Sequence, residues 1–310
     1  MNKILFGDCR ETLKTIDTKA QMCVTSPPYY GLRNYGNEEN QIGMEQSPEE
    51  YIEQLVDVFR SVRDVLTDDG TLWLNIGDTY YNYRSDGNYP KQTVSRTKQD
   101  LPDFSPVRGN KLHNLKSKDL IGIPWMLAFA LRADGWWLRQ DIIWNKPNPM
   151  PESVKDRCTK SHEYIFLLSK SKQYFYDNEA IKEPVKQDWG TRDRTNGKYH
   201  NPGTGLAPHS GLSKSYDRKN KRSVWTVTNK PYKGAHFAVF PPDLIEPCIL
   251  AGSEENDIVL DPFMGSGTTA MLAKKHNRNY IGCELNEDYA SLQTDRIDSI
   301  PSQLPAILWK

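Results

Sequence analysis

A glycine-rich turn between an apolar run and a helical pattern constrains the fold of this 310-residue chain more than any other feature. The pattern predicts a buried strand over residues 257–260, a turn over 261–269 (Asp-Pro-Phe-Met-Gly-Ser-Gly-Thr-Thr) and a helix over 268–275. A strand over 280–284 completes a βαβ unit. Two strands joined by a helix in this way are parallel, so the unit predicts a parallel sheet.

The same alternation of strands and helices runs through the rest of the chain. Ser47 and Glu50 form a capping-box pattern at the start of a helix that Gly70 is expected to end, and Gly135 is expected to end another. The fold class predicted is α/β, a doubly wound and mainly parallel sheet. Further strands are expected at 3–6, 21–25, 71–76, 139–144 and 163–168, and helices at 10–16, 48–66, 124–133, 242–250 and from 287.

Charge is unevenly distributed along the chain, although 40 basic and 40 acidic residues cancel overall. Residues 82–119 hold eight Lys/Arg against four acids and lack periodicity, which indicates a surface loop. Residues 181–235 hold twelve Lys/Arg against four acids, a formal charge of +8, and are also expected to be irregular. Such a cluster in a neutral protein favours contact with a polyanion over a solvated surface.

Membrane and metal functions are not indicated. The longest apolar run, 123–131, is too short to cross a bilayer, and the N-terminus does not resemble a secretory signal. The five cysteines are scattered without a Cys-x-x-Cys pair, so neither a disulfide framework nor a zinc site is predicted. We therefore expect a cytoplasmic protein without a bound metal.

The glycine-rich turn predicts a nucleoside site. Gly265 and Gly267 allow the backbone to approach a ligand closely, and Glu284 ends the next strand, where an acid typically holds ribose hydroxyls. The turn is not a phosphate-binding Walker loop, because no Lys precedes Thr268. The alternative is a tight turn with a helix-capping glutamate.

A second motif, residues 25–29 (Thr-Ser-Pro-Pro-Tyr), follows another predicted strand. One chemistry that this motif could serve is methylation of an amine on an aromatic base. Such an amine is a poor nucleophile, because its lone pair is delocalised into the ring. A site that methylates it needs acceptors for the amine hydrogens and a flat platform for the ring. Ser26 and the Pro27 carbonyl can accept, Pro28 fixes the backbone, and Tyr29 can stack. The alternative is a strand-ending turn with a surface tyrosine.

At these two motifs the sequence resembles the amino-methyltransferases of DNA, the family that makes N4-methylcytosine and N6-methyladenine. The catalytic motif comes first, the basic segment next and the cofactor motif last, an order that resembles the beta class. Further matches are Gly7-Asp8-Cys9, residues 144–147, 161–164 and 236–241. The resemblance covers nearly the whole chain. It implies a circularly permuted Rossmann-like methyltransferase fold with a catalytic half at 1–180, a basic target-recognition insert at 181–235 and a cofactor-binding half at 236–310.

The resemblance also implies roles for individual residues. Ser26, Pro27, Pro28 and Tyr29 would be catalytic, and Asp8 would meet the adenine of S-adenosylmethionine, although Asp8 and Glu11 also form a capping-box pattern. The remaining cofactor-binding positions would be Cys9, Thr25, His236, Phe240, Asp261, Phe263, Gly265, Ser266, Gly267, Thr268, Thr269 and Glu284. The insert would contact double-stranded DNA through Arg192, Arg194, Lys214, Arg218, Lys219, Lys221 and Arg222.

Several positions keep two interpretations. Trp144 packs against a flipped base or fills the core, and His162 is expected to be structural. Pro247-Cys248 has the dipeptide of carbon-5 cytosine methyltransferases but lies in an apolar helix, so Cys248 is expected in the core.

The function expected is methyl transfer to cytosine N4, because Ser at position 26 is usual for cytosine enzymes in this resemblance; the alternative is adenine N6. RNA and protein methyltransferases with related motifs place the cofactor motif first, and a non-catalytic nucleic-acid-binding protein would not need both motifs. The resemblance further suggests a prokaryotic or phage source. It leaves open a homodimer and a cognate restriction endonuclease.

Overall fold

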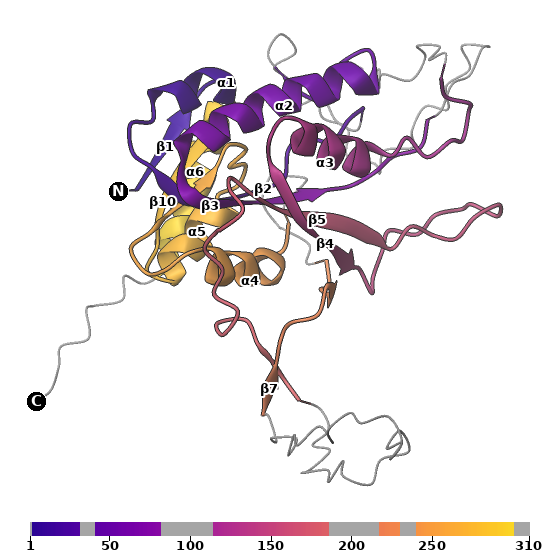
Figure 1. The fold of residues 1–310 in the computed structure, drawn as a ribbon. Coiled ribbons are helices and arrows are strands. Elements are labelled where there is room, and N and C mark those ends of the chain that lie inside the picture. The colour runs from indigo at the N-terminus through magenta and orange to yellow at the C-terminus, as the bar shows by residue number, and fades with distance from the viewer. Residues whose placement is uncertain (1, 32–40, 82–113, 186–216, 230–239, 301–310) are drawn as a thin grey trace, which may run out of the picture.

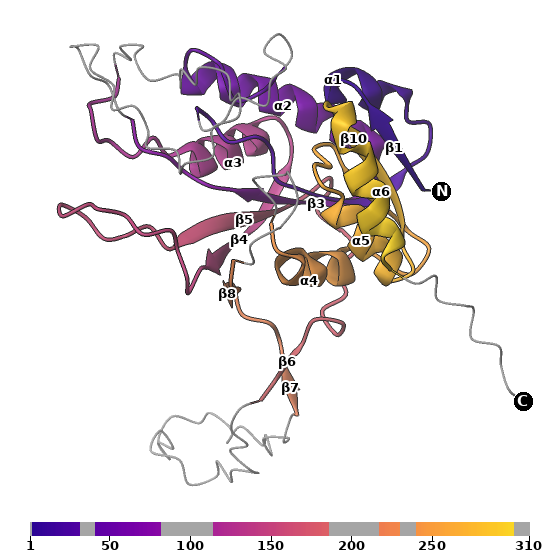
Figure 2. The same ribbon diagram turned by 180° about the vertical axis from the view of Figure 1, so that it is seen from behind.

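An eight-stranded sheet forms the centre of the protein, with helices on both faces (Figures 1 and 2). The structure, a computed structural model, describes residues 2–31, 41–81, 114–185, 217–229 and 240–300. Only β5 runs antiparallel to its neighbours in this sheet, which confirms the α/β class and the mainly parallel sheet. The strand order is β1 (Asn2–Phe6), β10 (Asn279–Glu284), β9 (Ile258–Asp261), β2 (Ala20–Thr25), β3 (Leu66–Ile76), β5 (His162–Ser169), β4 (Trp137–Asn145) and β8 (Val224–Thr226).

The sheet reverses its winding direction between β9 and β2, where Cys23 lies opposite Leu260. From this pair the chain runs outward through β10 on one side and through β3 on the other. Doubly wound sheets bind ligands at such a switch point. On one face lie α1 (Cys9–Thr12), the 3₁₀ turn η1 (Leu13–Thr15), α2 (Pro48–Val65) and α3 (Ile123–Ala133); on the other lie α4 (Pro242–Gly252) and α5 (Thr268–Lys275).

Two apolar cores hold these layers together. The core under α2 and α3 contains Phe59 and Leu127, and the core under α4 and α5 contains Trp73 and Ile249, all essentially inaccessible to water. The last helix, α6 (Ala290–Asp298), follows the short turn η2 (Glu287–Tyr289) and packs on α5. Burial on both faces explains why β9 and the second half of β5 read as continuous apolar runs rather than as alternating patterns.

The start of α2 was predicted correctly, but its end was not. The Ser47 hydroxyl accepts from the Glu50 amide at 3.2 Å, whereas the Glu50 carboxylate turns to the Gln46 amide at 3.1 Å, so only half of the expected box forms. The helix ends at Val65, and Gly70 lies inside β3. A Cβ at Gly70 would lie 3.0 Å from Leu66 Cβ and 3.1 Å from the Gln21 carbonyl, so glycine permits a bulge opposite β2.

The prediction of an irregular stretch over 181–235 is wrong for its described ends. β6 (Glu183–Pro184) pairs with β7 (Arg218–Lys219), and β8 joins the central sheet parallel to β4. Trp225 anchors β8, because its ring is buried and its Nε1 donates to the Arg222 carbonyl at 2.7 Å. Most of the expected loop at 82–119 lies outside the described residues.

The described helices include none that is both long enough and apolar enough to cross a membrane. Across the described ranges, no group of three or more His, Cys, Asp or Glu side chains is arranged to hold a metal ion.

Candidate active site

A cavity of about 640 Å³ opens along the edge of the sheet where the parallel strands end. The antiparallel strand β5 begins at this same edge, so its first residues also line the cavity. Its lining includes Gly7–Cys9 after β1, Ser26–Tyr29 after β2, Asn75–Asp78 (without Ile76) at the end of β3, Trp144 and Lys146 at the end of β4, His162 and Glu163 of β5, Pro262–Ser266 after β9 and Glu284–Asn286 at the end of β10.

The glycine-rich turn forms one end of this cavity. Gly265 and Gly267 have φ angles of +53° and +80°, which favour glycine, and α5 begins directly after them at Thr268. The Gly265 amide donates to the Glu284 carboxylate at 2.7 Å, so the turn and the end of β10 are tied together. Gly265 lines the cavity, whereas Gly267 lies behind it against Gln293.

Glu284 is a buried carboxyl at the cavity wall, with 8% of its surface exposed. Burial raises its pKa to about 7, even though the Asn286 and Gly265 amides donate to it and favour the charged form. The group therefore changes charge near neutral pH. Its position at the carboxyl end of β10 is the one expected of a ribose-binding acid.

Three expected cofactor residues, Thr25, Asp261 and Thr269, instead form a buried clamp behind the cavity. The Asp261 carboxylate accepts from both threonine hydroxyls at 2.6 Å and from the Phe263 amide at 3.0 Å. Burial raises the Asp261 pKa to about 6 against these hydrogen bonds. The clamp joins β2, β9 and α5, and none of the three residues is in the cavity lining. These three residues therefore hold the glycine-rich turn in position from beneath.

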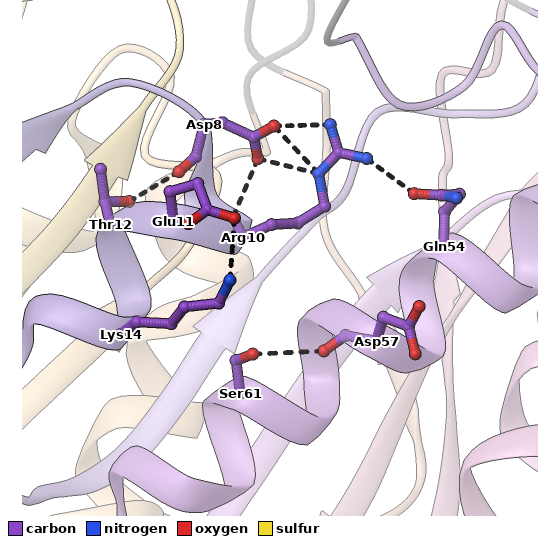
Figure 3. Close-up of polar contacts among 8 residues, drawn as sticks. All are labelled: Asp8, Arg10, Glu11, Thr12, Lys14, Gln54, Asp57 and Ser61. Atoms are coloured by element: carbon purple, nitrogen blue, oxygen red, sulfur yellow. Dashed lines mark hydrogen bonds and ion pairs between the residues drawn. The ribbon is translucent and has the colours of Figure 1, made fainter.

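Asp8 caps α1 at the same end of the cavity (Figure 3). Its carboxylate accepts from the Arg10 amide at 2.9 Å and from the Arg10 guanidinium, which also donates to Gln54 at 2.7 Å. Burial opposes the charged carboxylate, but the Arg10 contacts prevail and lower the Asp8 pKa. The expected box with Glu11 does not form, because the Glu11 carboxylate pairs with Lys14 at 2.8 Å.

The Ser26–Tyr29 motif forms the other end of the cavity. The Tyr29 hydroxyl donates to the Glu163 carboxylate at 2.8 Å. Burial raises the pKa of the Tyr29 hydroxyl. The Tyr29 ring lies against Gly77, where an added Cβ would come within 2.7 Å of the ring. The Pro28 carbonyl accepts from the Tyr51 hydroxyl at 2.7 Å. Both ends of the motif are therefore held in place.

Three residues at this end of the cavity were not among the predicted site residues. Lys146 and Glu163 lie in segments that match the family, but no role was predicted for either, and Asn75 was not predicted at all. The Lys146 ammonium pairs with the Glu163 carboxylate and lies 4.1 Å from the centre of the Trp144 ring. Asn75 Nδ2 donates to the Tyr164 carbonyl at 3.1 Å and lies 3.4 Å from Glu163 Oε2. The available signal was the pair of polar segments at the ends of two strands, 144–147 and 161–164.

The positions with two interpretations are now placed. Trp144 is 4% exposed and donates from Nε1 to the Val227 carbonyl at 2.8 Å, yet its ring also lines the cavity. His162 stands edge-on to the Tyr164 ring at 5.4 Å. Cys248 is fully buried in α4 with its thiol against the Leu244 carbonyl, which confirms the core prediction; burial raises its pKa.

The expected DNA-contacting residues of the insert do not line the cavity where they are described. Arg218 and Lys219 form β7, and Lys221 and Arg222 lie 3.8 and 3.2 Å from the Glu183 carboxylate. Arg192, Arg194, Lys214 and the expected cofactor residue His236 lie outside the described residues. The other expected residues, Cys9, Phe240, Phe263, Ser266 and Thr268, line the cavity.

Known proteins are similar to this chain in sequence and in fold. The family model described as DNA methylase matches residues 20–295. The Type II methyltransferase M.SmaI of Serratia marcescens is 49% identical over 95% of this chain and 90% of its own length, and M.Cfr9I of Citrobacter freundii is 46% identical over 94% and 86%. Two solved structures share the fold. The PvuII DNA methyltransferase (cytosine-N4-specific) has a TM-score of 0.61 and 17% sequence identity, and the match covers 95% of this chain and 86% of that one. A putative DNA modification methylase of Thermus thermophilus, complexed with S-adenosyl-L-methionine, has a TM-score of 0.59 and 22% sequence identity, and the match covers 97% of this chain and 95% of that one.

Proposed function

The chain belongs to the N6/N4 DNA methylase family, and from this premise we propose that it transfers a methyl group from S-adenosylmethionine to N4 of a cytosine extruded from double-stranded DNA. One observation carries the proposal. The glycine-rich turn and the Ser26–Tyr29 motif, more than 230 residues apart in sequence, line a single cavity at the switch point of the sheet. A donor bound at one end of this cavity faces an acceptor bound at the other.

S-adenosylmethionine is the methyl donor of this family, and the residues at the turn suit it. Glu284 offers a carboxylate to ribose hydroxyls, and Gly265 leaves the wall free of a side chain where the nucleoside would lie. Asp8 lies at this end of the cavity, and its carboxylate would accept from an amine in exchange for one of its contacts with Arg10. The bound donor supplies an activated methyl group, so the protein's own task is to hold the two reactants.

At the other end, the motif provides acceptors for the target amine. The Pro28 carbonyl is held by Tyr51, so we assign the Ser26 hydroxyl and the Pro27 carbonyl as the groups that orient the amine hydrogens. The Tyr29 ring, fixed by Glu163 and Gly77, offers a flat surface for the base. Holding the reactants in line contributes roughly 7–11 kcal/mol to the reduction of the barrier.

The choice of cytosine rests on position 26. Serine there is shorter than aspartate or asparagine and uncharged, which matches the cytosine enzymes in the resemblance described above. Lys146 and Glu163 are polar groups at this end of the cavity that can form hydrogen bonds with the edge of a base. Both cytosine and adenine have several such atoms, so these residues do not decide between them. The basic segment that includes Arg218, Lys219, Lys221 and Arg222 is proposed to contact DNA phosphates.

A single preparation of DNA tests the proposal. DNA from cells that express the protein is digested to nucleosides and analysed by mass spectrometry, with a Ser26→Ala strain as control. N4-methylcytosine in DNA from the wild-type strain, at a lower level in the Ser26→Ala strain, is the expected result. N6-methyladenine alone would overturn the base, and no modified nucleoside would overturn the activity. Methylation-sensitive sequencing of the same DNA identifies the recognition site. We further propose a restriction endonuclease of that specificity, since the relatives are Type II methyltransferases.

A further inference from the structure

The connection between β4 and β5 carries an exposed apolar side chain at the mouth of the cavity. This segment, residues 146–161, projects from the sheet as a long narrow loop (Figures 1 and 2). Met150 is 82% exposed, more than any other large hydrophobic side chain in the described ranges. It nevertheless lines the cavity, as do Pro149 and Glu152 beside it. The side chain therefore stands at the rim through which a base must enter.

Hydrogen bonds and an ion pair hold the segment 146–161 in shape on both sides of Met150. Glu152 pairs with Arg157 at 2.6 Å and accepts from the Lys160 amide at 3.2 Å. The Arg157 guanidinium also lies 4.0 Å from the centre of the Tyr80 ring.

On the other side, Asn148 exchanges two hydrogen bonds with the Asn229 backbone, at 3.0 and 2.9 Å. Pro149 and Pro151 fix φ on either side of Met150 and reduce the freedom of the chain there. The apolar side chain is thus presented on a segment that is held in shape.

Single exposed apolar residues are common on protein surfaces and need no explanation in themselves. The location of Met150 is what distinguishes it. Extruding a base leaves a gap in the base stack. Proteins that kink DNA insert apolar side chains between base steps, methionine among them, so a side chain of this kind suits such a gap. The segment 146–161 holds four Lys/Arg against two acids, so its charge suits the approach of phosphates.

We propose that Met150 is a wedge that enters the base stack and occupies the space vacated by the target base. This inference rests on the proposed DNA methyltransferase function. The wedge stabilises the extruded state, so it acts on base extrusion rather than on the methyl-transfer chemistry. Its contribution is largest when the target base is paired and stacked, and it disappears when extrusion no longer has to break a base pair.

The test compares single-turnover methylation of two duplexes that carry the mapped recognition site. One duplex has the target cytosine paired with guanine, and the other has it opposite an abasic position. Met150→Ala removes most of the wedge, Met150→Leu keeps an apolar side chain of similar volume, and Val154→Ala is the matched control on the same loop, since Val154 is exposed but absent from the cavity lining.

We expect Met150→Ala to lose about ten- to a hundredfold in the single-turnover rate constant on the paired target, with most of the loss recovered in Met150→Leu and on the abasic duplex. Equal activity of Met150→Ala and wild type on the paired target would overturn the wedge, and so would an equal loss on both duplexes. Wild-type activity on either duplex upholds the proposed function independently of these outcomes. Its absence on both would overturn that function instead.

Discussion

The Tyr29 hydroxyl donates a 2.8 Å hydrogen bond to the Glu163 carboxylate, although the two residues are 134 positions apart. Glu163, near the start of β5, also pairs with Lys146 and lies 3.4 Å from Asn75, so its carboxylate connects to residues at the ends of β2, β3 and β4. The Tyr29 ring is thereby held from its polar end, while Gly77 lies close to its Cδ2 and Cε2 atoms. This arrangement makes the orientation of the ring depend on a residue outside the Ser26–Tyr29 motif.

Tyr29→Phe tests this dependence, because it keeps the ring and removes the hydrogen bond. A hydrogen bond to a charged group contributes about 1.5–3 kcal/mol, and part of that should appear as a lower kcat through a less well-oriented ring. Affinity for S-adenosylmethionine should be unchanged. Tyr29→Ala should in addition raise KM for DNA. Tyr174→Phe is the control, since the Tyr174 hydroxyl accepts from Arg139 and does not line the cavity. An undiminished kcat in Tyr29→Phe would contradict the positioning role.

The two glycines of the turn should respond differently to substitution. Gly265 lines the cavity, so Gly265→Asp places a charged side chain in the nucleoside site and should abolish S-adenosylmethionine binding in calorimetry. Gly267 lies behind the cavity with φ +80°, so Gly267→Ala should cost about 1–2 kcal/mol of unfolding free energy while changing the cofactor Kd only a few-fold. Loss of binding in both variants, with unchanged stability of Gly267→Ala, would refute this division of roles.

Much of this fold was predictable because its signals are local. The helix over 268–275 and the strands β9 and β10 follow from apolar runs and the glycines between them. The end of α2 was predicted wrongly because Gly70 serves close packing against Gln21, a contact that sequence spacing does not reveal. β8 has three residues, too few for a periodic pattern, and owes its place to the buried Trp225.

The site was predictable as motifs but not as contacts. Both ends of the cavity contain the residues expected from the two motifs, because each motif directly follows a strand. Asp261 was expected to face the cofactor, yet it turns inward to Thr25, which precedes it by 236 positions. The meeting of Tyr29, Lys146 and Glu163 depends on the antiparallel pairing of β4 with β5, which places Trp144 opposite Glu163. Pairing of this kind is a tertiary property that a motif does not encode.

Cofactor binding should depend on pH through Glu284. Its pKa is about 7 in the free protein because the carboxyl is buried, and the carboxylate is the better acceptor for ribose hydroxyls. As pH rises from 6 to 8 the carboxylate forms, so affinity for S-adenosylmethionine should rise roughly tenfold before it levels off. In Glu284→Gln the affinity should be weaker and this component of the pH dependence should vanish. Parallel pH profiles for the two proteins in calorimetry would argue against the assignment.

The described basic residues of the insert should contribute to the salt dependence of DNA binding. Each lysine or arginine that contacts a phosphate contributes about 0.9 to the slope of log K against log salt concentration. Changing Arg218, Lys219, Lys221 and Arg222 to glutamine should flatten that slope for a non-cognate duplex by up to about 3.6, the value for four contacts. Glu183 lies close to two of these cations, so Glu183→Gln should free them and strengthen binding at low salt.

The control for this experiment removes positive charge elsewhere on the surface. Lys14 and Lys275 are exposed and pair with Glu11 and Glu246, far in sequence from the insert and outside the cavity lining. The double variant Lys14→Gln, Lys275→Gln should keep the wild-type slope, because counterion release requires contact with a phosphate and not only a change in total charge. If the control and the insert variant flatten the slope equally per charge removed, the effect is a property of net charge, and the insert has no special role in holding DNA.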